Sequence, residues 1–277
     1  MQLGLFARTF TRPTVEEVFD AVAGFHLRCV QFNFACAGLP SLPEALPDGL
    51  AERIRKAADE RRIAIGALSG TFNMIHPDAR LRQEGLRKLE ILAGACARLG
   101  TNVVTLCTGT RDPVNMWRGH PDNGSPDAWR NLRVSLTKAL TIANKHDLTL
   151  GIEPETSNVI DSAAKARRLL DEMKSPRLKI IMDPANLFHP GDLPRQSEII
   201  EDAFDLLGGD LVLAHAKELG ADGHPSGLAI GAGALDWDLY LTLLRRVKFS
   251  GPLILHGFEE ANAAASVQFL REKLGSK

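Results

Sequence analysis

The chain has 277 residues, of which 44% are hydrophobic and 24% are charged, and its formal net charge is −1. A barrel of eight strands and eight helices needs about 250 residues, so one such domain over residues 1–277 is possible. The near-neutral charge gives no support to nucleic-acid binding, which relies on a basic surface. No apolar run approaches the length of a membrane span, so we expect no membrane partner.

Short apolar runs alternate with longer amphipathic segments along the whole chain. We expect strands at residues 3–6, 29–34, 63–68, 103–107, 149–153, 178–182, 211–214 and 252–255. We expect helices at residues 14–24, 49–62, 80–99, 126–146, 162–173, 197–207, 237–247 and 261–274. Eight alternations with mostly short connections predict a single α/β domain, a (β/α)8 TIM barrel. An open doubly wound sheet is the alternative, but no dinucleotide-type glycine fingerprint follows the first strand.

Several helix ends and two loops carry local signals. Thr14 with Glu17 three residues on predicts a capping box, and Ser125 is a candidate N-cap. Gly100 is typical of the residue that follows a helix C-terminus. Residues 36–48 and 111–127 are rich in Pro and Gly and predict loops. Long polar loops in compact domains are commonly functional, so we expect Trp117 and His120 in the second loop to form a lid.

The four cysteines form no CxxC pair. Cys29, Cys96 and Cys107 lie in apolar stretches and are interpreted as small buried hydrophobic residues. The first residues contain no basic segment of the kind that opens a signal peptide. We therefore expect a reducing, cytoplasmic location.

Each of the last four predicted strands ends in a metal-capable side chain, at its last residue or directly after it: Glu153, Asp183, His215 and His256. Active sites of such barrels lie at the carboxyl ends of the strands. A buried ionised carboxylate is costly unless it is paired or bound to metal. Each residue alone has an ordinary interpretation, such as an ion pair, a turn-forming Asp or a satisfied buried His. Their coincidence predicts a site for one divalent metal ion, and the mixed donors leave Mn, Co, Zn, Mg and Fe open.

Four segments resemble a known family, the xylose-isomerase-like barrels. They are residues 151–153 (GIE), 183–186 (DPAN), 215–218 (HAKE) and 231–237 (GAGALDW). The family includes sugar isomerases and epimerases, inosose dehydratases and the endonuclease IV type of AP endonuclease. The resemblance covers most of the chain, and the order and strand placement of its motifs are more specific than any one of them.

The resemblance implies a divalent metal held by Glu153, Asp183, His215 and a strand-eight Glu. This chain has His256 at the fourth position, directly after the strand, and Glu259 three residues on is the alternative ligand. In the family's epimerases two glutamates exchange the proton, and a metal-bound imidazole is a poor base, so that scheme does not carry over unchanged. We hypothesise that Glu153 is the base, with Lys217, Glu155 or His256 as the acid.

Further polar and aromatic residues are candidates for contact with a substrate. They are His76, Trp117, Glu155, Asn186 and His189. Lys217 is a candidate for binding a carboxylate or phosphate as a point charge. The first three strands carry no motif. The sequence therefore does not show which residues determine the substrate.

These observations favour a divalent-metal-dependent isomerase or epimerase that acts on a small sugar, keto-sugar or polyol through an enediolate-type intermediate. A metal-dependent dehydratase of a keto-polyol and a non-catalytic ligand-binding barrel are the alternatives. An AP endonuclease is disfavoured because Asn186 stands where a further ligand His is expected, and residues 227–230 (GLAI) lack the expected Asp and His. Self-association into a homo-oligomer is left open.

Overall fold

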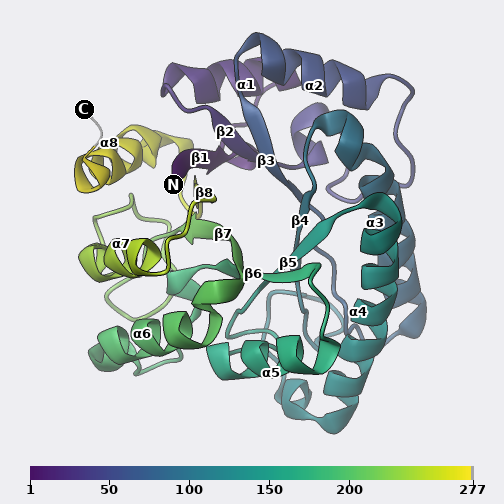
Figure 1. Ribbon diagram of the computed structural model, residues 1–277, viewed down its shortest axis with the longest axis vertical. Helices are drawn as coiled ribbons and strands as arrows, with labels where there is room; N and C mark the ends of the chain where they lie inside the picture. The colour runs from purple at the N-terminus through teal and green to yellow at the C-terminus, as the bar shows by residue number, and fades with distance from the viewer. Residues whose placement is uncertain (276–277) are drawn as a thin grey trace.

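Eight parallel strands form a closed barrel in the computed structural model, which describes residues 1–275 (Figure 1). Each strand pairs with the next, and β1 pairs with β8 through Gln2 opposite Pro252 and Leu5 opposite Leu255. The strands are β1 (Gln2–Phe6), β2 (Cys29–Phe32), β3 (Ala64–Ser69), β4 (Val103–Cys107), β5 (Thr149–Glu153), β6 (Leu178–Met182), β7 (Leu211–Ala216) and β8 (Pro252–Leu255). The closed barrel confirms the predicted fold class and rules out the open sheet.

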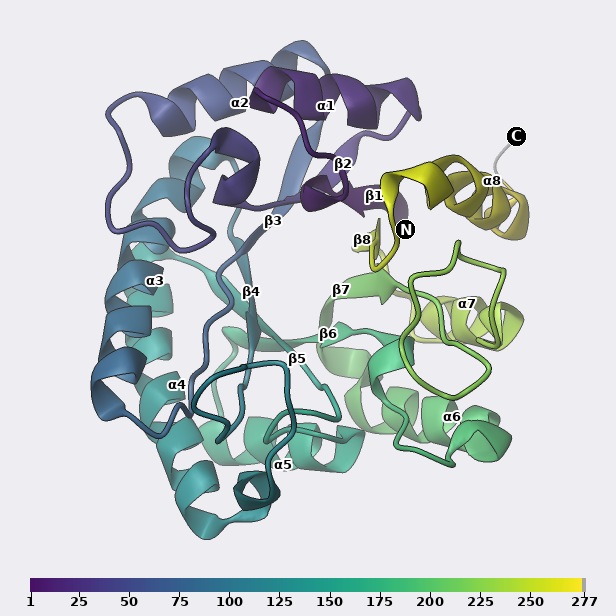
Figure 2. The same cartoon turned by 180° about the vertical axis from the view of Figure 1, so that it is seen from behind.

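Residues 1–275 contain eight α-helices. The two opposite views show helices around the outside of the barrel (Figures 1 and 2). They are α1 (Val15–Gly24), α2 (Leu50–Glu60), α3 (Ala79–Leu99), α4 (Pro126–His146), α5 (Ala163–Met173), α6 (Gln196–Leu207), α7 (Trp237–Arg246) and α8 (Ala263–Leu274). Within residues 1–275, no helix combines the length and the apolar character that crossing a membrane requires.

The predicted strand and helix boundaries agree with the structure to within two residues. Two strand ends that differ by two residues are informative. β2 ends at Phe32 and not at residue 34, because a 3₁₀ helix begins at Phe34. β7 continues to Ala216, two residues beyond the predicted end. His215 therefore lies inside a strand, where its direction is fixed by the strand's alternation.

The predicted helix caps are present, with one difference in detail. Ser125 accepts a hydrogen bond from Ala128 N at the start of α4, and Gly100 ends α3 with a φ of 75°. Thr14 Oγ1 accepts a hydrogen bond from Glu17 N at 3.2 Å, as an N-cap does. The Glu17 carboxylate accepts from the Thr14 hydroxyl at 3.0 Å and not from the backbone N–H, so the capping box is incomplete.

The core has two layers. A large outer layer joins the outward faces of the strands to the helices. A small inner cluster fills the barrel with Cys29, Ala67, Ile181, Leu213 and Ile254. Side chains alternate between the two layers along each strand, and this alternation decides which residues reach the barrel axis at the strand ends.

Candidate metal centre

The four metal-capable residues lie on inward-facing positions at the carboxyl end of the barrel. Three of them stand two residues after a member of the inner cluster, the members being Ile181, Leu213 and Ile254. Since side chains repeat direction every second residue, Asp183, His215 and His256 face inward as well. The outer layer holds the residues in between, such as Met182 and Leu255.

Glu153 reaches the same point by a related route. It stands two residues after Gly151, where a Cβ atom would lie only 2.8 Å from Ile181 Cγ1. That glycine therefore occupies an inward-facing position too crowded for a side chain, and Glu153 is the next inward residue of β5.

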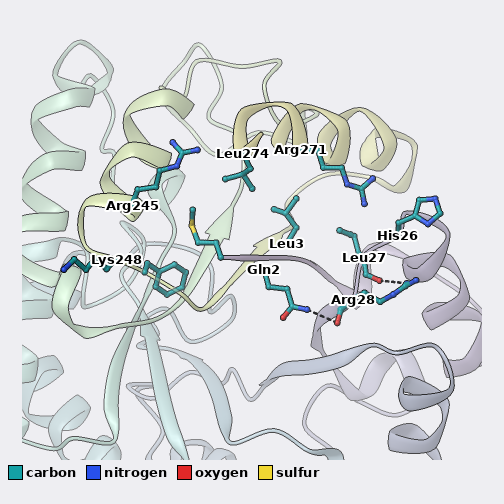
Figure 3. A pocket seen from close by; sticks show the side chains of 11 residues that line it. Gln2, Leu3, His26, Leu27, Arg28, Arg245, Lys248, Arg271 and Leu274 are labelled. Atoms are coloured by element: carbon teal, nitrogen blue, oxygen red, sulfur yellow. Dashed lines mark hydrogen bonds between the residues drawn. The ribbon is translucent and has the colours of Figure 1, made fainter. Parts of the chain in front are cut away.

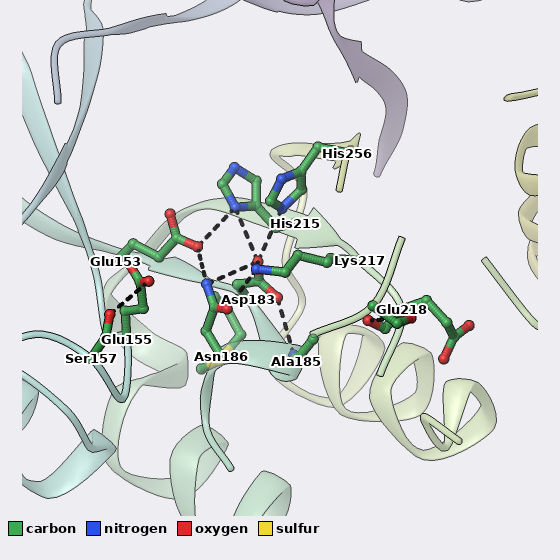
Figure 4. Close-up of polar contacts among 12 residues, drawn as sticks. Glu153, Glu155, Ser157, Asp183, Ala185, Asn186, His215, Lys217, Glu218 and His256 are labelled. Carbon is green, nitrogen blue, oxygen red and sulfur yellow. Dashed lines mark hydrogen bonds and ion pairs between the residues drawn. The ribbon is translucent and has the colours of Figure 1, made fainter. Parts of the chain in front are cut away.

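One ligand atom from each of these residues lies within 4.8 Å of the others. His215 Nδ1 is 3.3 Å from Glu153 Oε1 and 3.6 Å from Asp183 Oδ2 (Figure 4). His256 Nε2 is 3.0 Å from Asp183 Oδ2. Atoms that bind one ion at about 2.1 Å in a tetrahedral arrangement are about 3.4 Å apart. The spacing and the donor types therefore fit one divalent metal ion.

The charges around this point already resemble those of a cation site. Burial alone would raise the pKa of Asp183, but Lys217 and hydrogen bonds from His215 and His256 hold it well below its usual value. Burial would lower the pKa of His215, whereas the Glu153 and Asp183 carboxylates raise it to about 9. Positive charge is thus favoured at His215 Nδ1, between the two carboxylates, where a bound cation would replace it.

Gln31 on β2 fixes the orientation of His215. His215 Nε2 lies 2.9 Å from Gln31 Oε1, and Gln31 Nε2 donates to Thr105 Oγ1 at 3.3 Å. Because the Gln31 amide nitrogen is the donor to Thr105, its oxygen is the acceptor, so His215 carries a proton on Nε2. The Nδ1 lone pair of neutral His215 is then directed toward the carboxylates and is free to bind a metal.

Asn186 and Lys217 border the group. Asn186 Nδ2 donates to Glu153 Oε1 at 2.7 Å and to Asp183 Oδ2 at 3.2 Å. Lys217 Nζ donates to Asn186 Oδ1 at 2.6 Å and lies 3.6 Å from Asp183 Oδ2. Both side chains therefore hold the carboxylates in place through polar contacts (Figure 4).

A cavity of about 430 Å³ opens above the four donors. Most of the residues that line it are of polar types, and the lining comprises Phe6, Arg8, Gln31, Asn33, Ser41, Ser69, Thr71, Thr105, Met116, Trp117, Glu153, Glu155, Asn186, His215, Lys217 and His256. Glu155 accepts a hydrogen bond from the Ser157 hydroxyl at 2.9 Å. Burial and the neighbouring Glu153 raise the pKa of Glu155 to about 7. The cavity has the size of a small-molecule site.

Trp117, Glu155, Asn186 and Lys217 line this cavity together with three of the metal-capable residues, Glu153, His215 and His256. Trp117 is 55% exposed at its mouth, on the loop between β4 and α4. Figure 2 shows that loop and the one after β7 at the same end of the barrel. The structure thus brings together most of the residues predicted for the site.

Four predicted or alternative residues lie elsewhere, for identifiable reasons. His76 is used within a turn, where Nδ1 accepts from Asp78 N at 3.0 Å and Nε2 contacts Pro113 O at 3.1 Å. His120 Nδ1 accepts from Asp122 N. His189 is exposed and lines a separate hollow near α6. Glu259 is exposed beyond the end of β8, so His256 and not Glu259 joins the group.

Sequence reasoning did not identify several cavity residues from the first four strands, such as Arg8, Gln31, Asn33 and Thr105. Gln31 carried a usable signal, because it is a polar residue inside the apolar strand CVQF and is only 5% exposed. A buried polar side chain in a strand needs a partner. Arg8 carried no comparable signal, since an arginine after a strand is common on any surface.

A larger hollow, of about 680 Å³, lies at the opposite end of the barrel (Figure 3). Its lining includes Gln2, the first residue of β1, and Arg28 and Lys248, which precede β2 and β8. The catalytic groups of such barrels come from the carboxyl ends of the strands. The four donors are at that other end, so this hollow is separate from the candidate metal centre.

Glu218 connects two of the motifs noted in the sequence. Its carboxylate is 1% exposed and accepts hydrogen bonds from Gly231 N at 2.5 Å, Leu235 N at 3.2 Å and Trp237 Nε1 at 2.9 Å. The segment HAKE therefore anchors the segment GAGALDW. This contact fixes the loop that follows β7 beside the cavity.

The fold and the site together define a class of protein. It is a (β/α)8 barrel with two carboxylates and two imidazoles at the carboxyl end of its strands. The model of the xylose isomerase-like TIM barrel family matches residues 19–273, and the chain belongs to that family. No curated protein matches the chain significantly.

Solved structures of low sequence identity share the fold along their whole length. A D-tagatose 3-epimerase-like protein has a TM-score of 0.79 and 15% identity, covering 99% of this chain and 97% of its own. The 3-keto-D-glucoside 4-epimerase of E. coli has a TM-score of 0.72 and 19% identity, covering 99% and 98%. A probable 3-DHS dehydratase of Bacillus anthracis has a TM-score of 0.76 and 14% identity, covering 98% of each chain.

Proposed function

We propose that this protein is a divalent-metal-dependent isomerase or epimerase of a small sugar, keto-sugar or polyol. The observation that carries the proposal is the group of four donors within 4.8 Å of one another, three of which line a cavity of about 430 Å³. The family and the epimerase names of two similar structures support the same class of reaction.

Glu153, Asp183, His215 and His256 would hold the ion. When bound, it would supply a Lewis acid that stabilises negative charge on a carbonyl or hydroxyl oxygen of the substrate. Gln31 keeps His215 in the tautomer that offers Nδ1. Asn186 and Lys217 would hold the carboxylates as they do in this structure.

Glu153 is the proposed base because its two oxygens have different surroundings. Oε1 contacts His215 and Asn186, whereas Oε2 has no hydrogen bond within residues 1–275. Oε2 can therefore take the proton from the carbon beside the substrate carbonyl. The C–H electron pair then forms a carbon–carbon double bond, and the carbonyl π pair moves to the oxygen to give an enediolate. Return of a proton to the opposite face gives an epimer, and return to the former carbonyl carbon gives an isomer. Lys217, Glu155 and His256 line the cavity and are the candidate proton donors.

A dehydratase is the second candidate function, kept because one similar structure is a probable dehydratase. Proton abstraction by Glu153 would be the same first step. The enediolate would then expel a hydroxyl group as water from the next carbon. The product distinguishes the two reactions, because only the dehydratase gives a compound that lacks one water.

The test is deuterium exchange into a panel of ketoses, followed by NMR in ²H₂O with the metal-loaded protein. We expect exchange at the carbon beside the carbonyl. Loss of a general base typically lowers such a rate about 10²- to 10⁴-fold, so we expect that loss in Glu153→Gln. Glu259→Gln is the matched control, because Glu259 is exposed and outside the group. Unchanged exchange in Glu153→Gln would refute the assigned base, and ligand binding without any exchange would indicate a non-catalytic barrel.

A further inference from the structure

Arg8 is an unneutralised cation in the lining of the cavity. It lies in the 3₁₀ helix Ala7–Thr9 directly after β1 and is exposed. Within residues 1–275 its side chain has no ion pair and no hydrogen bond. Arg12, four residues on, is by contrast paired with Glu260 at 2.5 Å. The Arg8 guanidinium is thus available to a ligand in the cavity.

The second cation of the cavity is already engaged. Lys217 Nζ donates to Asn186 Oδ1 at 2.6 Å and lies 3.6 Å from Asp183 Oδ2. A divalent ion would neutralise the Glu153 and Asp183 carboxylates. Glu155 is the only other acid in the lining and cannot cancel both Lys217 and Arg8. The metal-loaded cavity is therefore net positive whether Glu155 is ionised or not.

The rest of the lining suits hydroxyl groups. Apart from Asn186, which is engaged at the metal centre, its amide and hydroxyl side chains are Gln31, Asn33, Ser41, Ser69, Thr71 and Thr105, which together donate and accept hydrogen bonds. They come from the first four strands and the loops after them, which is the half of the barrel that also carries Arg8. A ligand that contacts both the metal centre and this half spans the cavity from its base to Arg8.

We propose that the substrate is a polyhydroxylated carbonyl compound that carries an anionic group, a carboxylate or a phosphate, and that Arg8 binds this group. The inference rests on the proposed function, because it assigns the substrate class of the same site. A planar guanidinium forms paired hydrogen bonds with either anion, so the residue type fits both sources.

The experiment measures binding of three named probes to the metal-loaded protein by calorimetry. D-fructose is the neutral ketose, 2-keto-D-gluconate is the carboxylate probe and D-fructose 6-phosphate is the phosphate probe. We expect at least one anionic probe to bind 10-fold or more tightly than D-fructose. We expect Arg8→Gln to abolish that preference and Arg8→Lys to keep part of it. A preference for only one anion identifies the carboxylate or the phosphate.

Arg28→Gln is the matched control. Arg28 is an exposed arginine at the opposite end of the barrel and lines the other hollow, so its replacement changes the net charge equally without touching the cavity. The anion preference must survive in this variant. Circular dichroism checks that each variant is folded.

Two results would overturn the inference. One is wild-type protein that binds neither anion more tightly than D-fructose, including the case in which no probe binds. The other is an anion preference that persists in Arg8→Gln. Metal content is measured in the same samples, so the outcomes are separable. Protein that binds metal and D-fructose but shows no anion preference refutes only the role of Arg8. Protein that binds no metal refutes the proposed function itself.

Discussion

His215 depends on a residue that is not itself a donor to the metal centre. Gln31 Oε1 accepts from His215 Nε2 at 2.9 Å, and Thr105 orients the Gln31 amide from β4. A metal-binding His with its second nitrogen held in this way has a fixed tautomer and ring direction. Loss of that hydrogen bond should therefore lower the affinity of the centre for the metal.

Gln31→Leu should weaken metal binding about 10- to 100-fold, because His215 loses the acceptor that fixes its tautomer. Calorimetric titration against a competing chelator measures the change. Gln31→Glu keeps an acceptor at the same place and should retain most of the affinity. Equal affinity in wild type and Gln31→Leu would show that the hydrogen bond has no role in the centre.

The four donors could be predicted from the sequence because each directly follows, or nearly follows, an apolar strand of readable length. Parallel strands in a barrel end at one edge, so residue type and position were sufficient. The residues expected to contact a substrate were harder to predict. His76 and His189 follow apolar or motif segments too, yet His76 is used in a turn and His189 lies at the surface. Local hydrogen bonds of this kind leave no periodic signal in a sequence.

The loop after β7 shows how an element can position the site. Glu218 lies two residues beyond the end of β7, and its carboxylate accepts from Gly231 N, Leu235 N and Trp237 Nε1. Both segments resembled the family in sequence, but nothing in the sequence paired them. Their contact joins residues up to 19 positions apart and follows only from the folded path of the loop.

Glu218→Gln should lower the free energy of unfolding by about 1–3 kcal/mol, because an amide offers one acceptor atom and sets an N–H₂ group against N–H donors. Urea denaturation followed by circular dichroism measures this change. Limited proteolysis should also show faster cleavage within residues 219–236. Glu259→Gln, a substitution at an exposed site, should change stability by less than about 0.5 kcal/mol. Equal stability of the two variants would contradict the anchoring role.

All four cysteines are buried in the folded molecule, in agreement with the prediction for Cys29, Cys96 and Cys107. Burial raises the pKa of Cys29 and Cys36 to about 11 and that of Cys96 to about 12. Burial, with Glu155 and Glu153 nearby, also raises the pKa of Cys107 well above its usual value. The thiolate is the reactive form, so a raised pKa leaves little of it at neutral pH.

The native protein should therefore react slowly with a disulfide reagent such as DTNB at pH 8. The same protein in guanidinium chloride should release four equivalents of thionitrobenzoate per chain. Unfolding restores ordinary thiol pKa values and exposes the thiols to the reagent. Absorbance at the thionitrobenzoate band follows both reactions. A cysteine that reacts in the native protein as fast as in the unfolded chain would show that the barrel does not enclose it.

At the scale of the molecule, the fold could be predicted because eight apolar strand segments alternate with eight amphipathic helix segments along the sequence. The cavity could not, since its lining is gathered from all eight strands and the loops after them. Even the end of β7 was two residues off, because Ala214 and Ala216 give no sign of where pairing with β8 stops. The site depends on closure of the barrel, because only the closed barrel brings β2, β5, β6, β7 and β8 together.

Metal content per chain is the most direct test of the central claim. Protein that is stripped of metal with a chelator and then reloaded should hold one divalent ion per chain, as measured by elemental mass spectrometry. A crystal of that protein should show its anomalous signal between Glu153, Asp183, His215 and His256. Asp183→Asn should lose the ion while Glu259→Gln keeps it, because only Asp183 belongs to the group. A folded wild-type protein that retains no ion, or an Asp183→Asn variant that retains it fully, would contradict the account.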